Sequence, residues 1–187
     1  MMKNKSLLVI VLVPAMILLI PAAAMVFKVD GWAWGPLDFV VMWALMAGAG
    51  FAYKLATRKT VSLAYRAAAG LAVGTAFILT WINGAVGIVG SEDNPANLMY
   101  IGVVVVGLIG VAIARFQADR MAVVLFSMAL AQMLVPLIAL IISTHDFAPG
   151  VLPVFGLNAV FALAFIGSGL LFRLAARQSG THSLATN

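Results

Sequence analysis

Cysteine is absent from the chain of 187 residues, and charged residues are scarce. The absence of cysteine excludes disulfide bonds, thiolate metal ligands and cysteine nucleophiles. Charged side chains make up 9% of the residues, whereas a typical soluble domain has about 25%. A chain with so few polar side chains cannot cover its own surface in water, so lipid is expected to surround most of it. We therefore expect a membrane protein.

Signatures of catalysis are also missing from the sequence. It has no HExxH or GxSxG motif, no glycine-rich loop for phosphate and no pair of histidines spaced for haem. The centres of the long apolar runs hold no ionisable residue, which a proton or ion relay would need. Neither a cofactor nor a metal site is predicted. The net charge of +5 comes from scattered basic residues, so nucleic acid is not expected as a partner.

What the sequence does contain is a series of six long apolar runs. About 20 apolar residues are needed to cross a bilayer as a helix, and 64% of this chain is hydrophobic, with a mean hydropathy of +1.13. An outer-membrane barrel would instead show segments of about 10 residues that alternate apolar and polar side chains. The predicted fold is all-α, a single bundle of six transmembrane helices within residues 1–177, followed by a disordered cytoplasmic tail at 178–187. The expected spans are 6–27, 37–55, 63–89, 98–116, 121–143 and 152–174.

The distribution of Lys and Arg predicts how these spans are oriented. Cytoplasmic loops of membrane proteins are enriched in basic residues. With a cytoplasmic N-terminus, ten of the eleven basic residues lie inside and only Lys28 lies outside. The acidic residues show the opposite bias, because Asp119 alone of the six lies inside. We therefore expect both termini in the cytoplasm, which agrees with an even number of spans.

The first apolar run has a second interpretation. A basic start, an apolar stretch and Ala22-Ala23-Ala24 together resemble a secretory signal, whose cleavage would leave five spans. Signal sequences usually have an apolar core of about 7 to 15 residues, whereas this run extends from Leu7 to Phe27. The length favours a retained helix, and cleavage stays open as the alternative.

Two further patterns concern how the spans pack. Gly70 and Gly74 form a GxxxG motif in the third span, and Gly84, Gly87 and Gly90 continue it as a seam of small residues. Such residues let helices approach closely. The third span is therefore expected to be central to the bundle. Residues 48–58 are also similar to residues 167–177, at a constant offset of 119. This similarity indicates an internal repeat of the kind found in transporters, unless it is a chance match between apolar sequences.

Polar residues are concentrated between the third and fourth spans. Asn94-Pro95 is typical of a helix start, because an Asn oxygen caps free N–H groups and Pro loses no hydrogen bond in the first turn. Glu92 and Asp93 then lie near the positive end of the fourth helix. Two interpretations stay open here. The stretch is either an external turn with a helix cap, or a set of oxygen ligands that binds a hard cation or closes a site at the outer surface.

Three amide side chains lie within the predicted spans. Amides in hydrocarbon need partners and usually face the interior of a bundle. With a rise of about 1.5 Å per residue, Asn83 and Asn158 have similar depths below the outer surface, and Gln132 lies near the middle of the bilayer. Interhelical hydrogen bonding is one interpretation. The other is an outward-facing polar pocket, whose candidate residues are Asp38, Trp81, Asn83, Gln132 and Asn158, closed by Glu92, Asp93 and Asn94.

The stretch from Trp81 to Tyr100 also carries a family resemblance. Its sequence, WINGAVGIVGSEDNPANLMY, is preceded by Asp38-Phe39-Val40. The chain thereby resembles a family of small bacterial multi-pass membrane proteins of unassigned function with a W-x-N-x-AVG-x-x-GSEDNPAN-like signature. The resemblance covers residues 32 to 142. It implies a location in the bacterial inner membrane and carries no activity with it.

Three classes of function remain. The sequence favours a non-catalytic binding or accessory component of the membrane, because the spans lack central charges and the loops are too short for a soluble catalytic domain. A small permease or channel is the alternative, indicated by the possible repeat and the polar residues of the outer half. A membrane enzyme is the third class. The expected partners are the lipid bilayer and either another membrane protein or a small ligand.

Overall fold

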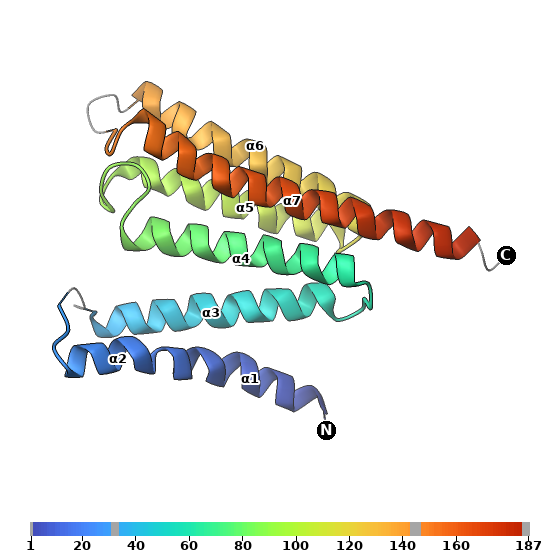
Figure 1. Cartoon of the computed structure of the whole chain (residues 1–187), viewed down its shortest axis with the longest axis horizontal. Helices are drawn as coiled ribbons and strands as arrows, with labels where there is room; N and C mark the ends of the chain where they lie inside the picture. Colours follow the sequence, from blue (N-terminus) through green and yellow to red (C-terminus); the bar gives the residue numbers. More distant parts are fainter. Residues whose placement is uncertain (1, 31–33, 143–146, 185–187) are drawn as a thin grey trace. The chain divides into compact units, whose positions relative to one another are not determined.

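The computed structural model describes residues 2–30, 34–142 and 147–184, and these residues contain helices and no strand (Figure 1). The all-α prediction is confirmed. The elements, in chain order, are α1 (Met2–Ile17), α2 (Leu19–Val26), α3 (Pro36–Thr57), α4 (Leu63–Ala85), the short 3₁₀ helix η1 (Pro95–Leu98), α5 (Met99–Ala114), α6 (Ala118–Ile142) and α7 (Val151–Leu184).

Six helical segments of the described chain are long and apolar enough to cross a membrane, as the sequence predicted. The first of them combines α1 and α2, which are separated only at Leu18. The separation has a local cause, because Pro21 has no N–H to donate to the carbonyl of Ile17 four residues earlier. The six segments are Leu7–Val26, Pro36–Thr57, Leu63–Ala85, Pro95–Ala114, Ala118–Ile142 and Val151–Ser179.

Two of these helices end at places that the sequence did not predict. The third span was expected to reach residue 89, but α4 ends at Ala85, because the backbone leaves the helix at Val86 and Gly87 has a positive φ of 70°. The second is α7, which was expected to end at residue 174 but continues to Leu184, into the tail predicted at 178–187. Ala, Arg and Gln in residues 175–178 are good helix formers, and the Ser179 hydroxyl donates to the Ala175 carbonyl at 3.0 Å. Residues 185–187 lie outside the described part.

The chain divides into two compact units, the N-terminal unit (residues 1–55) and the C-terminal unit (56–187). In the N-terminal unit, α3 packs against α1. The indole N–H of Trp43 donates to the Val11 carbonyl at 3.2 Å, and a Cβ at Gly50 would lie 3.5 Å from the side chain of Ile10. None of the described side chains of α3 is buried. The single bundle over 1–177 stays a prediction.

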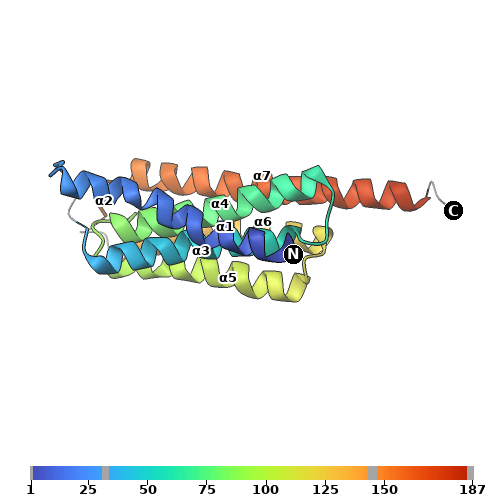
Figure 2. The ribbon, with the colours of Figure 1, turned by 90° about the horizontal axis from the view of Figure 1, so that it is seen from below.

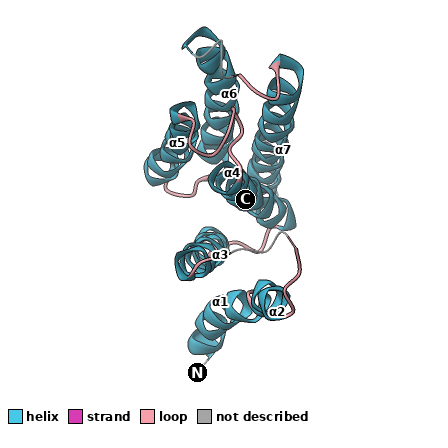
Figure 3. Cartoon of the chain, turned by 90° about the vertical axis from the view of Figure 1, so that its left-hand side faces the viewer, coloured by secondary structure: helices cyan, strands magenta, loops and turns pink. Residues whose placement is uncertain are grey.

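The C-terminal unit is a bundle of α4, α5, α6 and α7, seen end-on in Figure 3. Within it, α6 packs against both α5 and α7, and α7 also packs against α4. Phe165 and Phe172 of α7 and Leu79 of α4 are fully buried. The helix α7 is longer than its neighbours and runs past them at its C-terminal end (Figure 2).

Close helix contacts occur at glycines other than those of the predicted seam. A Cβ at Gly74 or Gly84 would meet nothing within 4 Å, so α4 does not use these two glycines for tight packing. At Gly110 of α5, by contrast, a Cβ would lie 2.6 Å from Val124 of α6. A Cβ at Gly107 would lie 2.7 Å from the sulfur of Met128. Within the C-terminal unit, α6 contacts both α5 and α7, and α7 also contacts α4, so α6 and α7 form the centre of this unit. A central position of the third span in the whole bundle stays a prediction.

Outward-facing side chains of the bundle are largely apolar. On α5, Ile101, Leu108 and Ile113 are 57%, 67% and 70% exposed. An isolated exposed leucine is ordinary on any protein, but a whole helix with this pattern is not. Apolar side chains on this scale match a hydrocarbon environment rather than water.

Candidate functional site

The turn between α4 and η1 is organised around one buried side chain, Asn97. Its Oδ1 accepts hydrogen bonds from the backbone N–H groups of Ile88 and Val89, both at 3.0 Å. Its Nδ2 donates to the carbonyls of Val89 at 3.0 Å and Ser91 at 2.7 Å. Asn97 is 4% exposed, and Ile88 and Val89 are also buried, so the bonds to these two residues satisfy backbone groups that have little access to solvent.

The local sequence explains why the turn forms around Asn97. Asn94 caps η1 by accepting a hydrogen bond from the Ala96 N–H at 2.9 Å, and Pro95 occupies the first helical position. Gly87 allows the close approach, because a Cβ there would lie 2.5 Å from the Ser91 carbonyl oxygen and 2.7 Å from Asn97 Nδ2. Its positive φ also favours glycine. Residues 87–97 thus form a tightly hydrogen-bonded turn.

Asn83 attaches the end of α4 to the same turn. Its Nδ2 donates to the backbone carbonyl of Asn97 at 3.1 Å. Its Oδ1 is buried and has no hydrogen-bond partner among the described residues. On the other side, the Gly90 N–H donates to the Ala148 carbonyl at 2.8 Å. The turn therefore connects α4, α5 and the segment that precedes α7.

A second polar group lies inside the C-terminal unit. Gln132 Nε2 of α6 donates to Asn158 Oδ1 of α7 at 2.8 Å. Asn158 Nδ2 in turn donates to the Tyr100 hydroxyl of α5 at 2.9 Å and to the Val154 carbonyl at 2.8 Å. We call Tyr100, Gln132 and Asn158 the amide triad, after the two amide side chains that it contains. Gln132 and Asn158 are 0% exposed, and Gln132 Oε1 has no partner among the described residues.

The candidate residues predicted from the sequence lie in different parts of the structure. The structure brings Gln132 and Asn158 together. Asn83 contacts the Asn97 turn, and Trp81 is exposed and stacks on Phe77, with ring centroids 6.2 Å apart. A pocket shared by the whole set stays a prediction.

The acidic candidates lie near helix starts and on the surface. Asp38 belongs to the N-terminal unit, where its Oδ2 accepts from the Gly35 N–H at 2.7 Å at the start of α3. This is a helix-cap geometry, favourable for an acid near the positive end of a helix. Glu92 and Asp93 are exposed on the turn. Among the residues that the structure describes, no three His, Asp or Glu side chains are grouped closely enough to hold a metal ion.

Sequence reasoning missed Asn97, at the centre of the turn, and Tyr100, a partner of Asn158 in the amide triad. The sequence does contain a weak signal for both residues. Asn97 and Tyr100 are three residues apart, so on a helical segment they share a face with each other. Both lie at the start of an apolar span, where a polar side chain needs a partner. Nothing in the sequence says which partner it finds, because that depends on the contacts between helices.

Comparison with protein-family models, with curated proteins and with solved structures gives no match for this chain. The resemblance of residues 32 to 142 to a bacterial membrane-protein family therefore stays a prediction.

Replacement of Asn97 tests whether the turn depends on it. In the Asn97→Leu variant, two backbone N–H groups and two carbonyls lose their partner, so we expect a loss of about 3 kcal/mol or more of stability. The measurement is unfolding of the purified chain in mixed micelles, followed by circular dichroism. Asp93→Ala, a change at an exposed position of the same turn, should remain within about 0.5 kcal/mol of the wild type. Equal stability of the two variants would contradict the central role of Asn97.

A double-mutant cycle tests the amide triad. Asn158→Leu leaves the amide of Gln132 and the hydroxyl of Tyr100 without their shared partner, whereas the double variant Gln132→Leu/Asn158→Leu removes both amides together. We therefore expect the double variant to lose less stability than the sum of the single variants, with a coupling energy of about 0.6 to 1.7 kcal/mol. The same unfolding assay measures it. Strictly additive effects would show that the two amides are not coupled.

Proposed function

We propose that the chain is a multi-pass integral membrane protein of the bacterial inner membrane, with both termini in the cytoplasm, and that it acts as a non-catalytic binding or accessory component. Six apolar helices of sufficient length support the membrane assignment. Their outward apolar side chains are suited to lipid or to the helices of a partner.

The charges at the two ends of the C-terminal unit support the orientation. The Tyr65 hydroxyl donates to the Phe116 carbonyl at 2.8 Å, so the start of α4 adjoins the loop that contains Arg115. Arg120 follows in the first turn of α6. The opposite end carries the Asn97 turn with Glu92 and Asp93. Apart from Asp119 at the basic end, basic and acidic side chains thus lie at opposite ends of α5. The length of α5 is about 24 Å at 1.5 Å per residue. This asymmetry is the one expected of a helix bundle with its basic end in the cytoplasm.

The single observation that carries the non-catalytic assignment is that the buried amide side chains form hydrogen bonds within their own unit. The side chains of Asn97, Gln132 and Asn158 are directed at other groups of the same unit, and all of them are buried. Such pairing serves to hold helices and turns together. The connections between the helices are short, so recognition is confined to the membrane-facing surface and the two ends.

A second candidate function, a small permease, is favoured by one specific observation. Gln132 Oε1 is fully buried in the apolar interior and lacks a hydrogen-bond partner among the described residues. A buried acceptor without a donor is unfavourable by about 1 to 3 kcal/mol. A small solute with N–H or O–H groups that passed between α5, α6 and α7 would satisfy it.

The absence of cysteine makes the orientation directly testable, because each single-cysteine variant carries one reactive thiol. In intact cells, we expect a membrane-impermeant maleimide to label Glu92→Cys. Arg120→Cys should be labelled only after the membrane is opened. Both positions are exposed in the structure, so access to the reagent depends on the membrane alone. Labelling of both variants from the same side would overturn the proposed topology.

Reconstitution and purification together distinguish the two functions. The full chain in liposomes is expected to be no more permeable to glycerol and urea than protein-free liposomes, as measured by stopped-flow light scattering. The chain extracted in mild detergent is expected to elute with a second polypeptide at a fixed ratio. Permeation that the Gln132→Leu variant abolishes would support the permease instead. A chain that elutes alone and shows no permeation would contradict the accessory role.

A further inference from the structure

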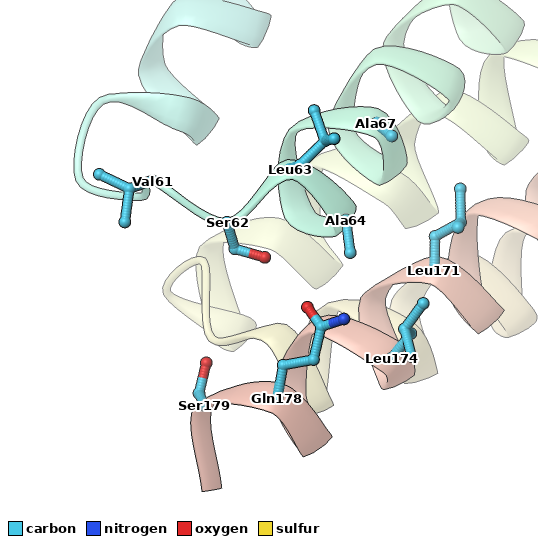
Figure 4. Close-up of a pocket in the computed structure, with 9 residues that line it drawn as sticks. All are labelled: Val61, Ser62, Leu63, Ala64, Ala67, Leu171, Leu174, Gln178 and Ser179. Carbon is cyan, nitrogen blue, oxygen red and sulfur yellow. The ribbon is translucent and has the colours of Figure 1, made fainter. Parts of the chain in front are cut away.

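A groove runs between the start of α4 and the C-terminal part of α7, at the basic end of the C-terminal unit (Figure 4). Its volume is about 510 Å³, within the range of roughly 300 to 1,000 Å³ typical of small-molecule sites. No residue of the amide triad or of the Asn97 turn contributes to it. The lining residues are Val61, Ser62, Leu63, Ala64, Ala67, Leu171, Leu174, Gln178 and Ser179.

The lining of the groove changes from apolar to polar along its length. Figure 4 shows Ser62 and Gln178 on facing walls near the loop before α4, with Leu171 and Ala67 farther along the helices toward the middle of the bundle. From Leu171 to Gln178 the distance along α7 is about 10 Å at 1.5 Å per residue. The polar lining residues of the groove therefore lie where the proposed membrane surface is, together with the exposed Val61 and Leu63, and the lining is wholly apolar where hydrocarbon begins.

Basic residues flank the polar end of the groove. Arg66 stands between the lining residues of α4, Arg177 precedes Gln178 on α7, and both side chains are exposed. Arg58 and Lys59, also exposed, precede the groove on the loop. Segments 56–67 and 167–179, which build this region, contain no acidic residue. The region therefore combines an apolar groove with a cationic end, which we call its cationic mouth.

Two exposed side chains at the rim add to this chemistry. Val61 is 99% exposed and Leu63 is 81% exposed. Apolar side chains this open, next to cationic ones, are typical of a segment that sits at the boundary between lipid headgroups and acyl chains. A free phosphate would use the basic residues but leave the apolar wall of the groove uncovered.

We propose that this groove binds one anionic phospholipid, with the phosphate at the Arg66 and Arg177 end and an acyl chain against Leu171 and Leu174. The proposal rests on the proposed membrane location and orientation of the chain. Its basis is charge complementarity together with the polar-to-apolar direction of the groove. Basic sites between helices on the cytoplasmic side are suited to anionic headgroups. A zwitterionic lipid would fill the apolar part equally well but would gain less from the cationic mouth.

Native mass spectrometry of the full chain in detergent tests the proposal, with phosphatidylglycerol and phosphatidylcholine of identical acyl chains as probes. We expect phosphatidylglycerol to be retained in preference, with one molecule bound most tightly. Arg66→Gln/Arg177→Gln should reduce retention of phosphatidylglycerol by about tenfold or more and leave phosphatidylcholine unchanged, because each basic residue near the surface contributes about fivefold. Ala64→Phe, which places a ring in the groove, should reduce retention of both lipids.

The matched control is Arg120→Gln, which removes the same charge from the same end at a position outside the groove. It should retain phosphatidylglycerol like the wild type. Equal retention of the two lipids by the wild type, or retention of phosphatidylglycerol unaffected by Ala64→Phe, would overturn the proposal. The proposal would also be overturned if Arg120→Gln lost as much phosphatidylglycerol retention as the double variant. Cysteine labelling tests the membrane orientation independently, so failure of the lipid site and failure of the proposed topology are distinguishable.

Discussion

The side-chain amide of Asn97 makes four hydrogen bonds to the backbone of one turn, and the connection between α4 and α5 depends on them. A turn at the end of two apolar helices has backbone groups that neither helix can satisfy. The Asn97 side chain donates two of these hydrogen bonds and accepts two, whereas a carboxylate can only accept and a hydroxyl has a single hydrogen to donate. The glycine at 87 is a consequence of this arrangement, since the amide approaches too closely for a Cβ. The same turn accepts a hydrogen bond from the Asn83 side chain and donates one to the Ala148 carbonyl.

The same requirement governs the interior of the C-terminal unit. Its apolar helices meet through close contacts at Gly107 and Gly110, and these contacts do not by themselves specify which helices pair. The amide triad specifies which helices pair, because the donor and the acceptor of Asn158 on α7 form hydrogen bonds with residues of α5 and α6. Charges are kept away from this interior and lie at the helix ends. The functional proposals follow from that separation, because the ends and the outer faces are what remains for a partner or a lipid to contact.

The helices were largely predictable from the sequence, and their ends were less so. Apolar runs of sufficient length correspond to the six helical segments. The end of α4 was misplaced because residues 86–90 are apolar and look like a continued helix, although Gly87 and Gly90 have positive φ. Gly74 and Gly84 of the seam in α4 were expected to pack tightly, but the structure has close contacts at Gly107 and Gly110 of α5 instead. Spacing alone does not reveal which face of a helix meets a neighbour. Of the candidate polar residues, Gln132 and Asn158 were correctly expected to need partners, but their contact with Tyr100 was not foreseen.

The sequence by itself determined composition, helix number and charge distribution, because hydropathy and helical length are properties of consecutive residues. It also determined the start of η1, since Asn94-Pro95 acts through its immediate neighbours. Only the tertiary structure decided that Asn97 closes the turn, that Asn158 joins Gln132 to Tyr100, and that α4 and α7 enclose a groove with a basic end. Each of these joins residues that are apart in the chain or that meet across a turn. Which side chains meet is set by the packing of whole helices, and no local pattern encodes it.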